Sequence, residues 1–203
     1  MNSLIQKLIG DCVLKTPLMI QAFHKIERAD FVPESIKSDA WRDCALPTFE
    51  DQTISQPYTV AFMLELLNPL GGETILDVGS GSGWVSALLA HAVGPKGRVC
   101  GIERIEQLVE FSKNNLSKYN FNNLEIIHGD GTKGLKKYAP FDKIHVAAAA
   151  SAIPRALKEQ LKIGGKMVIP TKNNDIRLIE KISKTKYTER IYHGFVFVPL
   201  VEG

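Results

Sequence analysis

The sequence predicts an α/β fold: a doubly wound, mostly parallel sheet preceded by a helical N-terminal cap. From residue 74 onward, short apolar runs rich in β-branched residues alternate with amphipathic stretches of helical period. The first apolar run passes directly into three glycines at alternate positions, and a helical stretch follows them at once. Strands that alternate with helices in this way form parallel sheets with helices on both faces.

Length and composition are those of one ordinary globular domain. The 203 residues suffice for a full core, and 44% are hydrophobic and 23% charged. We therefore expect a single domain over 1–203, with a cap over 1–52 and an α/β core over 53–203. A formal charge of +3 is too small to indicate nucleic-acid binding.

The cysteines and histidines give no sign of a metal or a disulfide framework. Cys12, Cys44 and Cys100 are scattered, and the five histidines show no ligand spacing. No run approaches the roughly 18 apolar residues of a membrane span, and the charged N-terminus is not a signal peptide. We expect a cytoplasmic monomer that binds no metal, nucleic acid or membrane.

The cap begins with two short helices. Apolar positions within 3–13 indicate an amphipathic helix, and Thr16-Pro17 begins a second that extends to about Ile26. The stretch 41–48 is predicted to be irregular. Pro57 suits the first turn of a third helix through Leu67, which Ser55 or Gln56 would cap.

Beyond residue 74 the predicted elements alternate. Helices are expected over 84–93, from 106 to about 119, and from Ser151–Pro154 to a stop at Gly164-Gly165. The last two of the seven expected strands are joined by a connection too short for a crossover helix, so the final strand should be antiparallel. The expected strands are 75–78, 98–103, 124–128, 143–147, 166–170, 177–182 and 195–200.

The glycine turn is the strongest functional signal. Residues 74–83 read T-I-L-D-V-G-S-G-S-G, which is a strand, a turn that allows close backbone approach, and a helix N-terminus. Asp77 precedes the first glycine, and Glu103 ends the next apolar run. In doubly wound sheets an acid about 20 residues past the turn binds a ribose diol.

These features together favour S-adenosylmethionine as the ligand. The spacing G-x-G-x-G differs from the dinucleotide fingerprint, and no Gly-Lys-Ser/Thr is present for nucleotide phosphates. S-adenosylmethionine offers a ribose for Glu103, a purine, and a cationic amine that Asp77 could face. The alternative is a sheet-to-helix turn with two incidental acids.

Two further stretches should lie at the carboxyl ends of the strands. Asp130, between two glycines, could bind the exocyclic amine and ring nitrogen of an adenine, or could simply form a turn. The run 147–151, A-A-A-A-S, offers exposed backbone with which an extended peptide could pair. The alternative for this run is a tight crossing beside the next helix.

Several stretches together resemble the protein-L-isoaspartate O-methyltransferases, which repair damaged aspartyl and asparaginyl residues. The resemblance covers nearly the whole chain. The glycine turn is common to many methyltransferases, whereas T-I-S-Q-P and A-P-F-D-K-I-H-V are much more specific. The matching stretches are R-A-D-F-V-P (28–33), Q-T-I-S-Q-P (52–57), L-D-V-G-S-G-S-G (76–83), G-I-E-R-I (101–105), G-D-G (129–131), A-P-F-D-K-I-H-V (139–146) and V-P-L (198–200).

The resemblance implies the fold of class I S-adenosylmethionine-dependent methyltransferases and a role for each matching residue. Ser55 matches the active-site serine beside the transferring methyl group. The implied cofactor-binding residues are Asp77, Gly79, Ser80, Gly81, Gly83, Glu103, Arg104, Asp130 and Gly131. The implied substrate-binding residues are Thr53, Ile54, Gln56, Ala148, Ala149 and Ser151.

The resemblance also implies a reaction and its partners. A methyl group would pass to the free α-carboxylate of an isoaspartyl residue in a protein or peptide, leaving S-adenosylhomocysteine. The ester would then cyclise to a succinimide and reopen partly as normal aspartate. A carboxylate with a pKa near ~3.5 needs no general base, so the protein supplies positioning.

Two departures from the family pattern lie near the expected substrate entrance. Phe49-Glu50-Asp51 stands where the family usually has a glycine-containing turn, and Ser151 where it often has proline. Two other functions therefore stay open. One is a methyltransferase of RNA or a small molecule, and the other is a cofactor-binding homologue without transferase activity.

Overall fold

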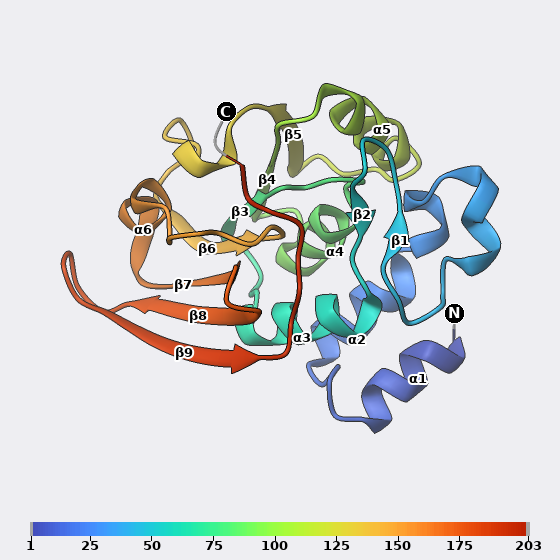
Figure 1. The fold of residues 1–203 in the computed structure, drawn as a ribbon, viewed down its shortest axis with the longest axis horizontal. Coiled ribbons are helices and arrows are strands. Elements are labelled where there is room, and N and C mark those ends of the chain that lie inside the picture. Colours follow the sequence, from blue (N-terminus) through green and yellow to red (C-terminus); the bar gives the residue numbers. More distant parts are fainter. Residues whose placement is uncertain (1, 202–203) are drawn as a thin grey trace.

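The computed structural model describes residues 2–201, which form a seven-stranded sheet flanked by helices (Figure 1). The strand order is β5-β4-β3-β6-β7-β8-β9. Pairing is parallel from β5 to β7, whereas β7 with β8 and β8 with β9 pair antiparallel. The strands are β3 (Thr74–Val78), β4 (Arg98–Glu103), β5 (Leu124–His128), β6 (Phe141–Val146), β7 (Leu161–Thr171), β8 (Asp175–Lys181) and β9 (Tyr187–His193).

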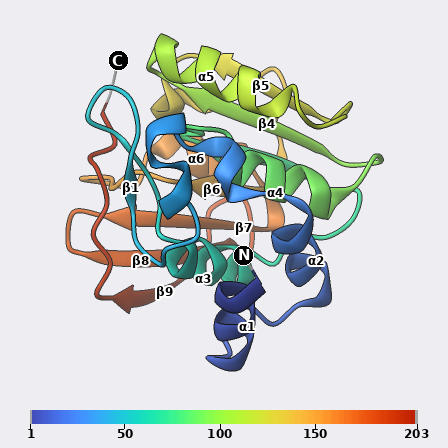
Figure 2. The same cartoon turned by 90° about the vertical axis from the view of Figure 1, so that its right-hand side faces the viewer.

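Helices cover both faces of the sheet (Figure 2). One face packs against α3, α4 and α5, while α2 lies on α3 and α4, and α1 lies on α2. The other face packs against α6 and the connection after β5. The helices are α1 (Asn2–Gly10), α2 (Pro17–Lys25), α3 (Pro57–Leu67), α4 (Trp84–Val93), α5 (Glu106–Leu116) and α6 (Arg155–Gln160), with 3-10 turns η1 (Arg28–Phe31), η2 (Glu34–Asp39) and η3 (Gly131–Lys133).

The segment around the glycine turn forms as the sequence predicts. Strand β3 is apolar and buried because it lies in the middle of the sheet with neighbours on both sides. Gly83, with φ +88°, directly precedes α4, and Gly94 ends that helix. The predicted α/β class and mostly parallel sheet are confirmed.

Ahead of α3 the chain forms a small hairpin that the sequence did not predict. Strand β1 (Leu46–Pro47) pairs antiparallel with β2 (Thr53–Ile54). Glu50 and Asp51 at its tip both have φ +54°, a region in which non-glycine residues are uncommon. The rings of Phe49 and Phe111, the latter on α5, pack edge-on with their centroids 4.9 Å apart. This contact holds the tip of the hairpin against α5.

The predicted last strand is wrong. Residues 187–193 form the edge strand β9, although most of their side chains are exposed and charge and apolarity do not alternate clearly. Residues 195–200, which read as a strand, instead leave the sheet and cross its carboxyl edge (Figure 1). Their aromatic residues pack on the core, and the rings of Phe195 and Phe62 stack at 5.0 Å.

The helix predicted to end at Gly164-Gly165 ends earlier, at Gln160. Lys181 donates to the carbonyl oxygens of Lys158, Glu159 and Leu161, which satisfies the end of α6. The two glycines lie inside β7, where the register with β6 shifts. A Cβ on Gly165 would lie 2.8 Å from the carbonyl oxygen of Asp142, so the glycine permits close strand approach.

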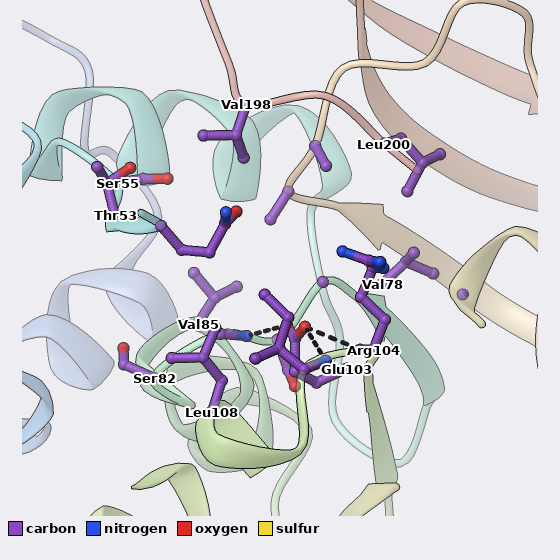
Figure 3. Close-up of a pocket in the computed structure, with 18 of the residues that line it drawn as sticks. Thr53, Ser55, Val78, Ser82, Val85, Glu103, Arg104, Leu108, Val198 and Leu200 are labelled. Carbon is purple, nitrogen blue, oxygen red and sulfur yellow. Dashed lines mark hydrogen bonds between the residues drawn. The ribbon is translucent and has the colours of Figure 1, made fainter. Parts of the chain in front are cut away.

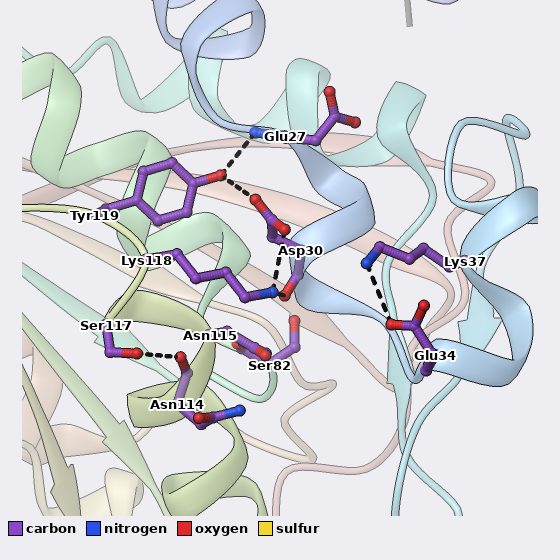
Figure 4. Close-up of polar contacts among 10 residues, drawn as sticks. All are labelled: Glu27, Asp30, Glu34, Lys37, Ser82, Asn114, Asn115, Ser117, Lys118 and Tyr119. Atoms are coloured by element: carbon purple, nitrogen blue, oxygen red, sulfur yellow. Dashed lines mark hydrogen bonds and ion pairs between the residues drawn. The ribbon is translucent and has the colours of Figure 1, made fainter.

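A polar cluster fastens the N-terminal segment to the core (Figure 4). The Tyr119 hydroxyl donates to Asp30 Oδ2 at 2.9 Å and accepts from the Glu27 backbone N–H at 3.0 Å. Lys118 adds a more exposed ion pair to Asp30. Burial, followed by the bond to Asp30, raises the pKa of Tyr119, so the hydroxyl keeps its proton as a donor.

Tyr119→Phe should lower the free energy of unfolding by about 1–2 kcal/mol, because it leaves the Glu27 amide and Asp30 without their shared partner. Urea denaturation measures the change. Lys118→Ala is the matched control and should cost about 0.5 kcal/mol or less, since exposed ion pairs contribute little. An equal cost for both would show that the hydroxyl does not dock the cap.

Candidate functional site

A cavity opens at the carboxyl ends of β3, β4 and β6, where the strand order reverses (Figure 3). This is the position at which doubly wound sheets bind ligands. The backbone N–H of Ala147 donates to the carbonyl oxygen of Val78 at 2.9 Å and keeps the ends of β3 and β6 together. The wall comprises residues 52–55, 78–82, 84–85, 102–105, 108, 131, 147–148 and 198–201.

The glycine turn forms the floor of this cavity. Gly79 and Gly81 line it with φ +74° and +52°, values that favour glycine. Ser80 lies between them and lines the cavity as well. Gly83 does not line it, because it faces α5, where a Cβ would lie 3.2 Å from Ser112. Three of the four predicted turn residues therefore reach the cavity, and Gly83 instead allows close packing.

Glu103 lines the cavity and also ties its loops together. One carboxylate oxygen accepts from the backbone N–H of Gly81 at 2.9 Å. The other accepts from the N–H groups of Arg104 and Ile105 at 2.8 and 3.0 Å, as Figure 3 shows. The predicted residues Glu103 and Arg104 thus stand on the wall, beside the turn.

The structure gives Asp77 a different place from the one the sequence suggested. Its side chain is fully buried and does not line the cavity, so the expectation that it faces a cationic amine disagrees with this geometry. Its oxygens accept from Ser86 Oγ at 2.5 Å and contact His145 Nδ1 at 2.7 Å. Asp77 therefore joins β3 to α4 and β6 beneath the glycine turn.

The sequence allowed two roles for Asp130, an adenine contact or a turn, and the structure shows the turn. Its Oδ1 accepts from both the backbone N–H and the hydroxyl of Thr132, which caps η3. Its Oδ2 lies 3.0 Å from Lys133 Nζ. Asp130 does not line the cavity, whereas the neighbouring predicted residue Gly131 does. A contact between Asp130 and a purine stays a prediction.

Ser55 lies where two cavities meet. Together with Thr53, Ala147 and Val198 it lines both the glycine-turn cavity and an adjoining second cavity. The Ser55 hydroxyl has no hydrogen-bond partner within residues 2–201, and it does not cap α3. Tyr58 N–H is capped by Asp43 instead. Ser55 is thus free to interact with a ligand in either cavity.

The other predicted substrate residues divide into two groups. Thr53, Ile54 and Ala148 line the glycine-turn cavity, and Gln56 lines the second cavity. The side chain of Gln56 also donates to the Asp43 carbonyl oxygen at 3.1 Å. Ala149 and Ser151 line neither of these two cavities.

The backbone expected to pair with a peptide is already paired within the chain. Ala149 N–H donates to the carbonyl oxygen of Val198 at 2.7 Å, and Leu200 N–H donates to that of Ala149 at 2.9 Å. Ala150 pairs with Pro170 and Lys172 in the same manner. The C-terminal segment therefore occupies this edge, and it supplies Val198 to Val201 to the cavity wall.

Sequence reasoning missed the apolar part of the wall. Trp84, Val85 and Leu108 line the cavity but read as helix core, because helical periodicity does not distinguish core from cavity. The match of Val198-Pro199-Leu200 to the family ending was the signal that could have placed the C-terminal segment at the site.

The lining residues fit an adenosine-like ligand on their own chemistry. Gly79 and Gly81 allow a ligand to approach the backbone closely, Glu103 offers carboxylate oxygens, and Val78, Ile102 and Leu108 offer apolar contact. Ser80 Oγ and Trp84 Nε1 are buried polar atoms that have no hydrogen-bond partner among residues 2–201. Buried polar atoms normally have a partner, so both are consistent with a ligand or water in the wall.

The family profile of protein-L-isoaspartate(D-aspartate) O-methyltransferase matches residues 1–203. The chain belongs to this family. It is 41% identical over 202 residues to the protein-L-isoaspartate O-methyltransferase of Methanopyrus kandleri, covering 98% of this chain and 89% of that protein. Identity to the enzyme of the same name from Ignicoccus hospitalis is 42% over 204 residues, with 99% and 97% coverage.

Solved structures of this methyltransferase family have the same fold. A crystal structure of a protein-L-isoaspartate O-methyltransferase from Plasmodium falciparum, in complex with S-adenosyl-L-homocysteine, superposes with a TM-score of 0.89 at 26% identity. It covers 99% of this chain and 98% of that one. A second protein-L-isoaspartate O-methyltransferase superposes with a TM-score of 0.90 at 25% identity.

Neither a metal cluster nor a membrane-spanning helix occurs in the part of the chain that the structure describes. Among residues 2–201, no cluster of three or more His, Cys, Asp or Glu side chains is arranged to hold a metal ion. Within the same residues, none of the helices combines the length and apolarity needed to cross a bilayer.

Proposed function

We propose that this protein transfers a methyl group from S-adenosyl-L-methionine to the free α-carboxylate of L-isoaspartyl residues in proteins and peptides. The observation that carries the proposal is the position of Ser55, which lines both the glycine-turn cavity and the second cavity. Membership of the family and the likeness to a structure that holds S-adenosyl-L-homocysteine support it.

The glycine-turn cavity is the proposed cofactor site. Gly79, Ser80 and Gly81 would let the amino-acid portion approach the turn closely, and Glu103 would accept from the ribose hydroxyls. The walls around Ile102 and Gly131 would take the purine. When bound, S-adenosyl-L-methionine supplies an electrophilic methyl group on a sulfonium centre, and S-adenosyl-L-homocysteine remains after transfer.

The second cavity is the proposed substrate site. Its wall comprises Ala45, Thr53, Ser55, Gln56, Thr59, Ala147 and Val196 to Val198. The groups Thr53, Ser55 and Ala147 belong to both cavities, so a substrate here would reach the cofactor across them. Because the backbone of Ala149 is already hydrogen-bonded to the C-terminal segment, it is not free to pair with a peptide. A bound peptide would instead contact the hydroxyl, amide and apolar side chains of this wall.

The chain's own residues act by positioning and not by proton transfer. Lining residues of the glycine-turn cavity in the described chain include no His, Cys or Lys. None is needed, because an α-carboxylate with a pKa of ~3.5 is already ionised at neutral pH. The Ser55 hydroxyl would donate a hydrogen bond to one carboxylate oxygen and aim the other at the methyl group. Apolar walls reduce the water that competes for the carboxylate.

We also propose that the protein works as a cytoplasmic monomer on isoaspartyl proteins, without a nucleic-acid or membrane partner. The three cysteines support a reducing compartment, since all are free and Cys100 is buried. Burial raises the pKa of Cys100 to about 11, so this thiol is unreactive. The small formal charge of +3 supports the absence of a polyanionic partner.

The decisive experiment uses labelled S-adenosyl-L-methionine and two peptides that differ only in one aspartyl or isoaspartyl linkage. We expect base-labile methyl ester on the isoaspartyl peptide alone. Total RNA is offered in a parallel reaction. Labelled RNA with unlabelled peptide would overturn the proposed substrate, and cofactor binding by calorimetry without transfer to any acceptor would overturn the proposed activity.

Ser55→Ala should lower kcat for the isoaspartyl peptide by about a hundredfold, because one positioning hydrogen bond in a dry site is lost. The dissociation constant for S-adenosyl-L-homocysteine should change less than about threefold. Steady-state kinetics and calorimetry measure both. Ser38→Ala, an exposed serine of η2 that lines neither cavity, is the matched control and should behave as wild type. Equal losses of kcat and cofactor affinity in Ser55→Ala would remove its positioning role.

Glu103→Ala should weaken S-adenosyl-L-homocysteine binding at least about tenfold, since a charge-assisted hydrogen bond to ribose is lost. Because Glu103 also ties the loops, calorimetry is repeated with a 2′-deoxyribose analogue. The wild type should disfavour the analogue and the variant should not. Glu106→Ala, an exposed acid on α5, is the control. Wild-type affinity in Glu103→Ala, or unchanged discrimination, would rule out ribose binding.

A further inference from the structure

Arg28 is a fully buried cation in the short turn η1 of the cap. Its Nη1 donates to the carbonyl oxygens of Ala40 and Arg42. Its Nη2 donates to the carbonyl oxygen of Cys44 at 3.1 Å and to that of Ser55 at 2.9 Å. One guanidinium therefore joins three points of the loop 40–44 to the backbone of the proposed active-site serine.

The bonds of Arg28 go to backbone atoms and to a ring, and no ion pair to it occurs within residues 2–201. Its Cζ lies 5.2 Å from the centroid of Trp84, which lines the glycine-turn cavity. Burial lowers the pKa of Arg28 to about 10, so the group stays charged at neutral pH. A buried charge without a carboxylate is costly unless it is hydrogen-bonded, and the carbonyl oxygens of Ala40, Arg42, Cys44 and Ser55 supply those bonds.

A second set of contacts fixes the same two segments. Asp43 Oδ1 accepts from the Tyr58 N–H at 2.9 Å, and the Asp43 carbonyl oxygen accepts from the Gln56 side chain. On the other side, the pairing of β1 with β2 holds Thr53 and Ile54. Ser55 lies between these attachments, and the bond from Arg28 is the one that reaches its own peptide group.

We propose that Arg28 is a positioning residue for the methyl transfer, acting through Ser55. Arg28 binds the Ser55 carbonyl oxygen on one side and contacts the Trp84 ring on the other. It thereby fixes the position of the Ser55 hydroxyl relative to the glycine-turn cavity. This inference rests on the proposed function. The planar fork is essential, because a lysine ammonium has a different geometry and cannot reach four divergent carbonyl oxygens at once.

The test is a double-mutant cycle with Arg28→Lys, Ser55→Ala and the double variant. If Arg28 acts through Ser55, Arg28→Lys should lower kcat for the isoaspartyl peptide at least tenfold in the wild-type background. The same substitution should lower kcat less than twofold in the Ser55→Ala background. Affinity for S-adenosyl-L-homocysteine should change less than threefold. Arg155→Lys, an exposed arginine on α6, is the matched control.

A merely structural role gives a different result. Assays are run well below each variant's unfolding midpoint, as measured by circular dichroism. Normal kcat in Arg28→Lys, or equal factors of loss in the two Ser55 backgrounds, would overturn the proposal. Failure of the wild type to methylate the peptide would refute the proposed function itself, which separates the two failures.

A measurement on the wild-type protein covers the case in which Arg28→Lys does not fold. In isotope-labelled protein with S-adenosyl-L-homocysteine, NMR should detect a scalar coupling across the hydrogen bond between Arg28 Nη2 and the Ser55 carbonyl carbon. The guanidinium protons should exchange slowly with water. Absent coupling together with exchange as fast as that of free arginine would overturn the proposal.

Discussion

The site depends on how two parallel strands end. Strands β3 and β6 lie side by side at the reversal of strand order, and the bond from Ala147 N–H to the Val78 carbonyl oxygen keeps their ends in register. The chains leaving them diverge, because one turns into α4 and the other meets the C-terminal segment. The space between them is the glycine-turn cavity. The buried contacts of Asp77 with Ser86 and His145 hold strand, helix and strand together below it.

The surroundings of this cavity explain how the site can work without a titrating catalytic group. Its polar wall includes the hydroxyl-bearing residues Ser55 and Ser80, the carboxylate of Glu103 and the side chain of Arg104. Two distant parts of the chain hold this wall in place. The N-terminal segment contacts Ser55 through Arg28, and the C-terminal segment pairs with Ala149. Both ends of the chain therefore shape the place where carboxylate and methyl donor would meet.

Short-range patterns predicted most of the fold. Strand β3 and helix α4 were predicted because an apolar run, glycines and helical period follow each other within 20 residues. The last strand could not be predicted in this way. Tyr187–His193 pairs at an exposed edge, where alternation is weak. Phe195 and Phe197 instead pack, part-buried, against the core, while Val196 between them is 79% exposed. Apolar content therefore does not by itself indicate pairing in a sheet.

The sequence by itself determined the α/β class, the glycine turn and the family resemblance, because these depend on residues close together in the chain. Only the tertiary structure decided which of the three acids lines the cavity: Glu103 does, whereas Asp77 is buried and Asp130 caps a turn. It also decided that Arg28 contacts Ser55 and that the C-terminal segment covers Ala149. The reason is physical, because a side chain's direction and its partners are set by packing between segments that no local pattern connects.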